Sequence, residues 1–308
     1  MMGEMNKLST YTWTPDSDKM IRISKSTLDT YSNWCSQQMW LGKVCRTEPL
    51  ERDYLVIGDN VHNAQEEFYE NLVCDTPRME KAIAVAKDGD EKTAFRLLKE
   101  MYPVAEGDYA DREEALQNWM IHNDVARLKH CAEPDDFLPT GNELDLDAIV
   151  EVDVPGHGIV KVHLRGIIDR IFKDENDELI LMELKTGKFN PKYTPPKMRG
   201  EMAYYTYLLN ESDANLGDVK WWAWRFPKAE HWDVVLASKR TITAMKKRMG
   251  RLVKSYLEQD FPVVSDRQEY KCSHCDFMQF CPKWTPYENP IEVSHGADPI
   301  WKEDVEHE

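Results

Sequence analysis

Two stretches rich in β-forming side chains flank a short polar segment near the middle of the chain. Apolar residues recur from Val160 to Ile168, a polar run occupies residues 173–178, and residues 179–184 are again largely apolar. Such a pattern is typical of two antiparallel strands joined by a turn. It therefore predicts a β-hairpin over residues 158–186.

Other patterns predict the elements around this hairpin. Ser26 and Asp29 have the spacing of a capping box, which would open a helix that carries Cys35. The other expected elements are a largely helical region at 59–132, interrupted near 88–90 and 103–108, strands at 143–154 and 219–226, a helix at 198–210 and a basic helix at 238–257. Helices therefore alternate with strands, which predicts an α/β fold.

Three charged residues interrupt the apolar hairpin. Side chains on a strand alternate between its faces, so Glu183 and Lys185 share one face, and Asp169 can meet them across the strand pair. Buried charges are normally paired or bound to a metal. Mg²⁺ or Mn²⁺ takes carboxylate oxygens plus water and neutralises the charge that develops on a phosphate under attack. An exposed hairpin with an ordinary charged face is the other interpretation of an isolated Glu-x-Lys.

These residues belong to a longer motif. Gly166-x-x-Asp169, Glu183-x-Lys185-x-Gly187 and Glu201-x-x-x-Tyr205 together resemble the RecB-type branch of the PD-(D/E)XK nuclease superfamily. The resemblance implies a restriction-endonuclease-like core, which is a mixed central sheet flanked by helices. It also implies a nuclease that depends on Mg²⁺ or Mn²⁺.

The resemblance also implies roles for single residues. His62 lies where such enzymes carry a metal-ligating histidine, so it would hold the metal with Asp169, Glu183 and the backbone carbonyl of Leu184, while Lys185 positions the water. A histidine on a helix is otherwise an ordinary surface or core residue.

The last part of the motif departs from the family pattern. The family usually has glutamine where this chain has Glu201, and an ionised glutamate accepts hydrogen bonds but donates none. We therefore expect Glu201 to pair with Lys185. Tyr205 lies four residues later on the same helix face, and it is either a catalytic residue or part of the core.

Three cysteines lie within ten residues near the C-terminus. Cys272, Cys275 and Cys281 need a fourth ligand to complete a tetrahedral site or to hold a cubane cluster, and Cys35 can supply it. One remote cysteine and a C-terminal trio resemble the iron-sulfur subgroup of these nucleases, which includes the exonucleases of CRISPR adaptation and the AddB nuclease domain. There four thiolates bind a [4Fe-4S] cluster. Zinc, with Cys35 or His274 as the fourth ligand, would satisfy the same spacing.

Composition and charge narrow the class of protein. Ten tryptophans and thirteen tyrosines in 308 residues argue against disorder. With neither a secretory signal nor a membrane-spanning apolar run, and with an odd number of cysteines, we expect a cytoplasmic protein without disulfides. The net charge of -16 opposes binding to a polyanion unless basic residues are concentrated locally.

Basic residues are indeed concentrated in two segments that contain no acidic residue. Residues 184–200 carry five basic residues and residues 238–257 carry seven. The DNA-binding candidates among them are Lys188, Lys192, Lys197, Arg199, Lys246, Lys247, Arg248 and Arg251. A solvated helix face is the other interpretation of the second segment. The run Trp221 to Phe226 could stack on unpaired bases, but such a run is more often a core strand.

The sequence therefore leads to one organisation and one main hypothesis. We expect a leader (1–22), a single nuclease domain (23–284) with a helical insertion at about 64–132 and a cysteine clamp of Cys35 plus 272–281, and an acidic tail (285–308). The hypothesis is a DNA exonuclease that acts on single strands or free ends, with protein partners in recombination, repair or CRISPR adaptation. The alternative is a non-catalytic DNA-binding subunit of recombination or repair with a zinc or iron-sulfur clamp.

Overall fold

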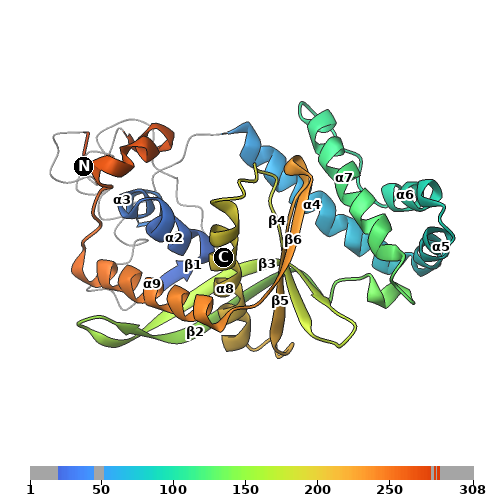
Figure 1. Cartoon of the computed structure of the whole chain (residues 1–308). Helices are drawn as coiled ribbons and strands as arrows, with labels where there is room; N and C mark the ends of the chain where they lie inside the picture. The colour runs from blue at the N-terminus through green and yellow to red at the C-terminus, as the bar shows by residue number, and fades with distance from the viewer. Residues whose placement is uncertain (1–19, 45–51, 279–280, 282, 285–308) are drawn as a thin grey trace, which may run out of the picture.

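A six-stranded mixed sheet forms the centre of the computed structural model, which describes residues 20–44, 52–278, 281 and 283–284 (Figure 1). The strands are β1 (Ile21–Ser24), β2 (Gly141–Val154), β3 (Gly158–Lys173), β4 (Leu179–Leu184), β5 (Val219–Phe226) and β6 (His231–Leu236). The strand order is β1-β3-β4-β5-β6, and β2 pairs with β3. β1 with β3 and β4 with β5 are parallel, whereas the other pairs are antiparallel.

Helices cover both faces of this sheet. They are α2 (Lys25–Asp29), α3 (Ser36–Met39), α4 (Asp53–Cys74), α5 (Thr76–Lys87), α6 (Glu91–Lys99), α7 (Ala110–Leu128), α8 (Thr194–Glu211) and α9 (Lys239–Glu258). One core cluster joins the sheet to α8 and α9, and a second joins it to α4–α7. The expected α/β fold with a mixed sheet flanked by helices is therefore confirmed. No helix in the described part of the chain has the length and apolarity needed to cross a membrane.

Burial along β3 shows where the second layer begins. Up to Leu164 its side chains alternate between buried and more exposed, but every residue from Ile168 to Phe172 is buried. The change follows because Phe172 packs into the α4–α7 cluster while Ile168 and Ile171 pack into the other. Asp169 thus lies where helices cover both faces of the sheet.

The N-terminal elements differ from expectation at two points. β1 begins at Ile21, so the expected leader cannot extend to residue 22, because Ile21 and Ile23 are buried strand residues paired with β3. The helix cap is Ser24, whose side chain accepts a hydrogen bond from Thr27 N, rather than Ser26. Residues 1–19 and the expected tail at 285–308 lie outside the described residues.

Strands β5 and β6 differ in how far the sequence predicted them. The tryptophan run forms β5, in which Trp222 and Trp224 are fully buried, so they pack in the core and are not available to stack on bases. Strand β6 was not expected; it pairs with β5 and has an alternating half-exposed pattern.

A buried ion pair ties the helical layer to the sheet. Arg225 Nη2 of β5 donates to Asp124 Oδ1 of α7 at 2.9 Å, and neither side chain is more than 1% exposed. Arg127 also donates to Asp124 Oδ1. Breaking a buried pair by removing one partner leaves an uncompensated charge in the interior.

We expect Asp124→Ala to lower the free energy of unfolding by about 3–5 kcal/mol, measured by urea unfolding. Glu91→Gln is the matched control, because Glu91 pairs with Lys129 on the surface and is 63% exposed. That change should lower the free energy of unfolding far less than Asp124→Ala does, because an exposed ion pair contributes little to stability. Equal effects of the two substitutions would contradict the structural role of the buried pair.

Candidate active site

Asp169 and Glu183 lie one residue beyond the last paired residues of the hairpin, Arg170 and Met182. Leu184 N donates to Asp169 Oδ2 at 2.7 Å, which fixes that carboxylate against the end of β4. Asp169 is 6% exposed and Glu183 is 2% exposed. The register of two adjacent strands therefore places two buried carboxylates side by side.

His62 approaches Asp169 from the other layer. It lies in α4, and its Nδ1 atom is 3.6 Å from Asp169 Oδ2 and 3.7 Å from Glu143 Oε1. One ligand atom from each of His62, Glu143 and Asp169 lies within 4.8 Å of the others, a spacing that a metal ion could bridge. Glu143 was not among the residues expected from the sequence.

The backbone at Glu143 is strained. Its φ of 46° is in the left-handed region, which a non-glycine residue rarely adopts, and it interrupts the pairing of β2 with β3. Arg170 Nη1 donates to Glu143 Oε1 at 2.7 Å and holds the carboxylate beside His62. Strained residues held in place by their surroundings concentrate at functional sites. A positive φ at a glutamate has no clear signal in the sequence, which is why Glu143 was missed.

Two lysines contact the Oε1 atom of Glu183. Lys185 Nζ donates to Glu183 Oε1 and lies 3.3 Å from Glu201 Oε2. Lys25 Nζ, from the first residue of α2, lies 3.2 Å from Glu183 Oε1 and 3.1 Å from Glu201 Oε2. The expected pairing of Glu201 with Lys185 is therefore present, and Lys25 joins it.

The charges in this cluster shift one another. Burial and the Glu183 carboxylate raise the pKa of Asp169 to about 6. Burial alone would also raise the pKa of Glu201, but the ammonium groups around it, Lys185 and Lys25 foremost, lower this pKa to about 2. Glu201 is thus a carboxylate that accepts hydrogen bonds from lysines and cannot donate.

Tyr205 lies beside the same cluster on α8. It is 4% exposed, and Lys25 Nζ lies 5.6 Å from the centre of its ring. Burial, together with the carboxylates of Glu183 and Asp169, raises the pKa of its hydroxyl, which stays protonated. Its ring also packs in the core, so both interpretations made from the sequence are compatible with its position.

The carboxylates are suited to a cation. Glu183 Oε2 is fully buried and has no hydrogen-bond partner among the described residues, while its Oε1 atom is saturated by two lysines. A buried carboxylate oxygen without a partner is costly unless an ion or water satisfies it. The donor set around it, carboxylates plus one imidazole, suits Mg²⁺ or Mn²⁺. These residues therefore fit a divalent cation.

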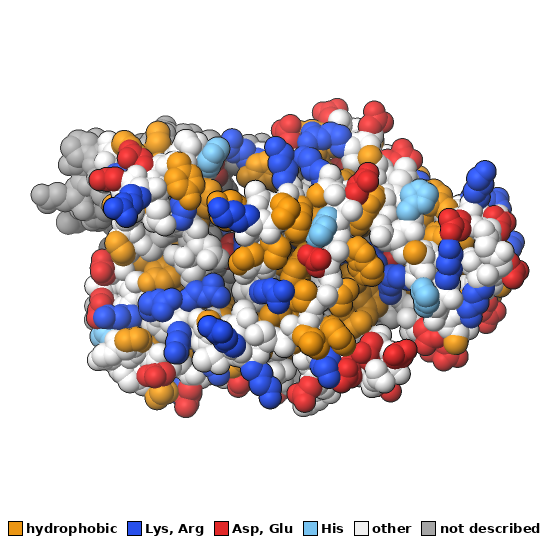
Figure 2. All heavy atoms as spheres, viewed as in Figure 1, with side chains coloured by type: hydrophobic (Ala, Val, Ile, Leu, Met, Phe, Trp, Pro, Cys, Tyr) orange, Lys and Arg blue, Asp and Glu red, His pale blue; other side chains and the backbone are white. Residues whose placement is uncertain are grey.

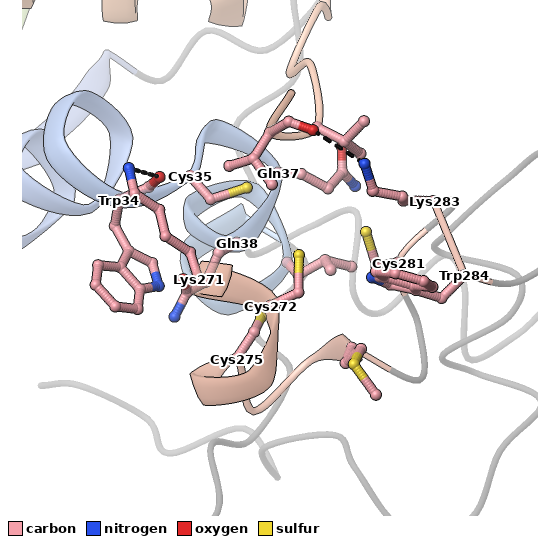
Figure 3. Close-up of a pocket in the computed structure, with 14 residues that line it drawn as sticks. Trp34, Cys35, Gln37, Gln38, Lys271, Cys272, Cys275, Cys281, Lys283 and Trp284 are labelled. Atoms are coloured by element: carbon pink, nitrogen blue, oxygen red, sulfur yellow. Dashed lines mark hydrogen bonds between the residues drawn. The ribbon is translucent and has the colours of Figure 1, made fainter. Parts of the chain in front are cut away.

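The four expected cysteine ligands line one pocket (Figure 3). Cys35 has extended backbone at the start of α3. Cys272 lies in the short helix Asp266–His274, and Cys275 follows that helix directly. Lys271 Nζ joins the two segments by donating to the carbonyl oxygens of Asn33 and Trp34. Cys281 completes the set, whereas the exposed His274 is not among the lining residues.

The chemistry of this pocket fits a soft metal or a cluster. Burial raises the pKa of Cys275 to about 11 and also raises the pKa of Cys281. Ligation would compensate for deprotonating these thiols, because metal binding and thiolate formation are coupled. Cys74 is exposed and Cys131 is buried elsewhere in the chain, so neither belongs to the set.

The two basic segments lie on neighbouring elements. Lys188 and Lys192 lie between β4 and α8, and Lys197 and Arg199 lie on α8. Figure 2 shows a row of basic side chains along α9, the helix that carries Lys246, Lys247, Arg248 and Arg251. Lys246 Nζ lies 4.1 Å from the ring centre of Tyr207 on α8. Packing of α8 on α9 thus brings the second basic segment against the helix that carries Lys197, Arg199 and Glu201.

Comparisons with known proteins show the family of this chain. A chain described as "Crystal structure of SSO0001" is similar in structure, with 12% identity, a TM-score of 0.38, and coverage of 92% of this chain and 98% of that one. No curated protein sequence matches the chain significantly. The family model of the PD-(D/E)XK nuclease superfamily matches residues 22–282. Since this model spans most of the chain and includes both strands of the carboxylate hairpin, the chain belongs to the PD-(D/E)XK nuclease superfamily.

Proposed function

We propose that this protein is a metal-dependent DNA nuclease of the RecB-type branch, and that it acts as an exonuclease on single strands or free ends. The observation that carries the proposal is the convergence of Asp169 and Glu183 beside Lys185, with one Glu183 oxygen buried and without a hydrogen-bond partner in the described ranges of the chain. A site of this kind accounts for charges that the interior would otherwise disfavour.

The side chains divide the work between them. His62, Asp169, Glu183 and the carbonyl of Leu184 would hold the cation. Of these, His62 and Asp169 form a group with Glu143 in which the ligand atoms lie within 4.8 Å of one another, so Glu143 would be a further ligand. When bound, the cation supplies Lewis acidity and an activated water. Lys185 stays charged, because burial lowers its pKa less than the carboxylates of Glu183 and Glu201 raise it. Its ammonium can therefore orient the attacking water or stabilise charge on the phosphate.

The test is a time course on end-labelled linear DNA and on circular single-stranded and double-stranded DNA, with Mg²⁺, Mn²⁺ or EDTA. We expect loss of the terminal label from linear DNA with either cation, intact circles, and no cleavage in EDTA. Cleavage of circles would replace the exonuclease proposal by an endonuclease. Absence of cation-dependent cleavage on every substrate would refute the nuclease itself.

We further propose that α9 binds the DNA backbone. Lys247 and Arg251 are exposed and lie four residues apart, so they project from the same face of α9. Replacing both by glutamine should reduce the slope of log K against log salt concentration by about 1.8 on duplex DNA and about 1.4 on single strands, since each phosphate contact contributes about 0.9 and about 0.7, respectively. Fluorescence anisotropy at several salt concentrations measures this slope. An unchanged slope would leave α9 as an ordinary solvated helix.

We also propose that Cys35, Cys272, Cys275 and Cys281 hold a [4Fe-4S] cluster with a structural role. The proposal is supported by four cysteines lining one pocket between an N-terminal helix and the C-terminal segment. Arg52 Nη2, at the start of α4, donates to Asp276 Oδ1 at 2.7 Å and so ties the C-terminal segment to α4 as well. Zinc in the same site is the competing assignment.

A further inference from the structure

The Glu183 carboxylate is held through one oxygen only. Lys25 Nζ and Lys185 Nζ both donate to Oε1, whereas Oε2 is buried without a partner in the described part of the chain. Two ammonium groups on the same oxygen fix the orientation of the carboxylate. They leave the second oxygen turned away from the lysines.

Glu201 balances these two lysines. Its Oε2 atom lies 3.1 Å from Lys25 Nζ and 3.3 Å from Lys185 Nζ, and its side chain is 4% exposed. Lys197 Nζ also lies 3.6 Å from Glu201 Oε1, but it is 51% exposed and has Asp29 as a second partner. The buried centre of the cluster therefore holds two ammonium groups, Lys25 and Lys185, and two carboxylates, Glu183 and Glu201. Such a balance is what a buried group of charges requires, because each unpaired charge would carry a large desolvation cost.

The fold delivers Lys25 to this position from far along the chain. Lys25 follows β1 directly, and the parallel pairing of β1 with β3 aligns Ser24 with Arg165. The Lys25 side chain is only 21% exposed, so the surrounding side chains hold its ammonium group beside Glu183. Lys25 and Glu183 are separated by 158 residues in sequence.

We propose that Lys25 and Glu201 act as one charge pair that positions Glu183 for the cation. This inference rests on the proposed nuclease site and assigns Lys25 as a positioning residue within it. Lys25 holds Oε1 of Glu183, and Glu201 cancels the extra positive charge that Lys25 brings. Removal of either Lys25 or Glu201 alone would therefore change the net charge beside the cation site.

A charge pair predicts a result that a role of Glu201 in packing alone would not produce. Glu201→Gln keeps the shape of the side chain but leaves two ammonium groups on one carboxylate, and their excess charge repels a divalent cation. We expect the affinity of the DNA-free protein for Mn²⁺ to fall about 10-fold or more. Removing the extra ammonium as well, in Lys25→Met/Glu201→Gln, should restore the affinity to within about 3-fold of the original.

The measurement is the Mn²⁺ dissociation constant, obtained from the electron paramagnetic resonance signal of free Mn²⁺. Glu178→Gln and Lys220→Met/Glu178→Gln are the matched controls, because this pair has a similar Nζ to Oε1 distance of 2.8 Å but is far more accessible to solvent, with Lys220 47% and Glu178 35% exposed. Neither control should change the dissociation constant.

Two results would overturn the inference: an unchanged Mn²⁺ affinity in Glu201→Gln, or a double variant that binds Mn²⁺ no better than Glu201→Gln. If Glu201→Gln does not fold by circular dichroism, charge balance predicts that the double variant folds, and an unfolded double variant overturns the inference as well. Cleavage assays on the unaltered protein keep the two proposals apart. A protein that binds Mn²⁺ but cuts no DNA refutes the nuclease, whereas an active nuclease without rescue refutes only the pair.

Discussion

Asp169→Asn should reduce cation-dependent cleavage of DNA by about 10³-fold or more, because it removes a negative charge that would bind the cation, and the cation stabilises the charge that develops on the phosphate. The substitution changes the volume very little, and the amide oxygen can still accept the hydrogen bond from Leu184 N. Relieving charge repulsion between Asp169 and Glu183 should leave the protein at least as stable. The measurement combines degradation of end-labelled DNA with thermal unfolding in EDTA.

Asp177→Asn is the matched control for this substitution. Asp177 lies in the turn of the same hairpin, is 86% exposed, and has a φ of 61°, which asparagine also tolerates. The control should cleave DNA at the original rate. Equal activity of Asp169→Asn and Asp177→Asn would exclude the assigned catalytic centre. If the unaltered protein binds single-stranded DNA with steep salt dependence but never cleaves it, the non-catalytic subunit considered from the sequence becomes the better hypothesis.

The sequence predicted those parts of the site that local geometry determines. Antiparallel pairing across one short turn almost forces Asp169 and Glu183 together, and strand alternation puts Lys185 beside Glu183. A period of two and a recognisable turn are sufficient for this prediction. Since the superfamily match covers these residues, the fold around them was predictable as well.

The residues that were missed reach the site through long-range pairing. Lys25 depends on the parallel alignment of β1 with β3, and Glu143 depends on a left-handed backbone residue in β2. Neither feature has a periodic signature in the sequence. The region around Lys25 also lies close to the expected leader, where an isolated short strand of four residues gives little signal.

The helical region illustrates a further limit. Its helices were expected from their pattern, but their role was not, because a pattern does not say which surface a helix covers. In the structure α4 starts at Asp53 and brings His62 to the sheet, while α7 supplies the buried partner of Arg225. The helical layer therefore completes the core on the second face of the sheet and provides one candidate metal ligand.

Cys275→Ser should release the metal from the cysteine pocket and lower the melting temperature by about 5 °C. Serine is a poor ligand for iron or zinc at this position, and energy from a structural metal contributes directly to folding. A loss of about 3–4 kcal/mol corresponds to a shift of this size in a chain of 308 residues, because the entropy of unfolding grows with chain length. Metal analysis, visible absorption and thermal unfolding of the purified protein measure the effect. A [4Fe-4S] cluster predicts a brown protein that contains iron and sulfide and loses its colour in Cys275→Ser.

Cys74→Ser separates this effect from a general response to losing a thiol. Cys74 is exposed at the end of α4 and does not line the pocket, so its substitution should change neither metal content nor melting temperature. Stoichiometric zinc in a colourless protein, lost in Cys275→Ser but kept in Cys74→Ser, would assign the same four ligands to zinc. Equal metal content in all three proteins would contradict any metal at this pocket. The proposal for the carboxylate cluster would stand in either case, because its carboxylates and the cysteines belong to separate parts of the fold.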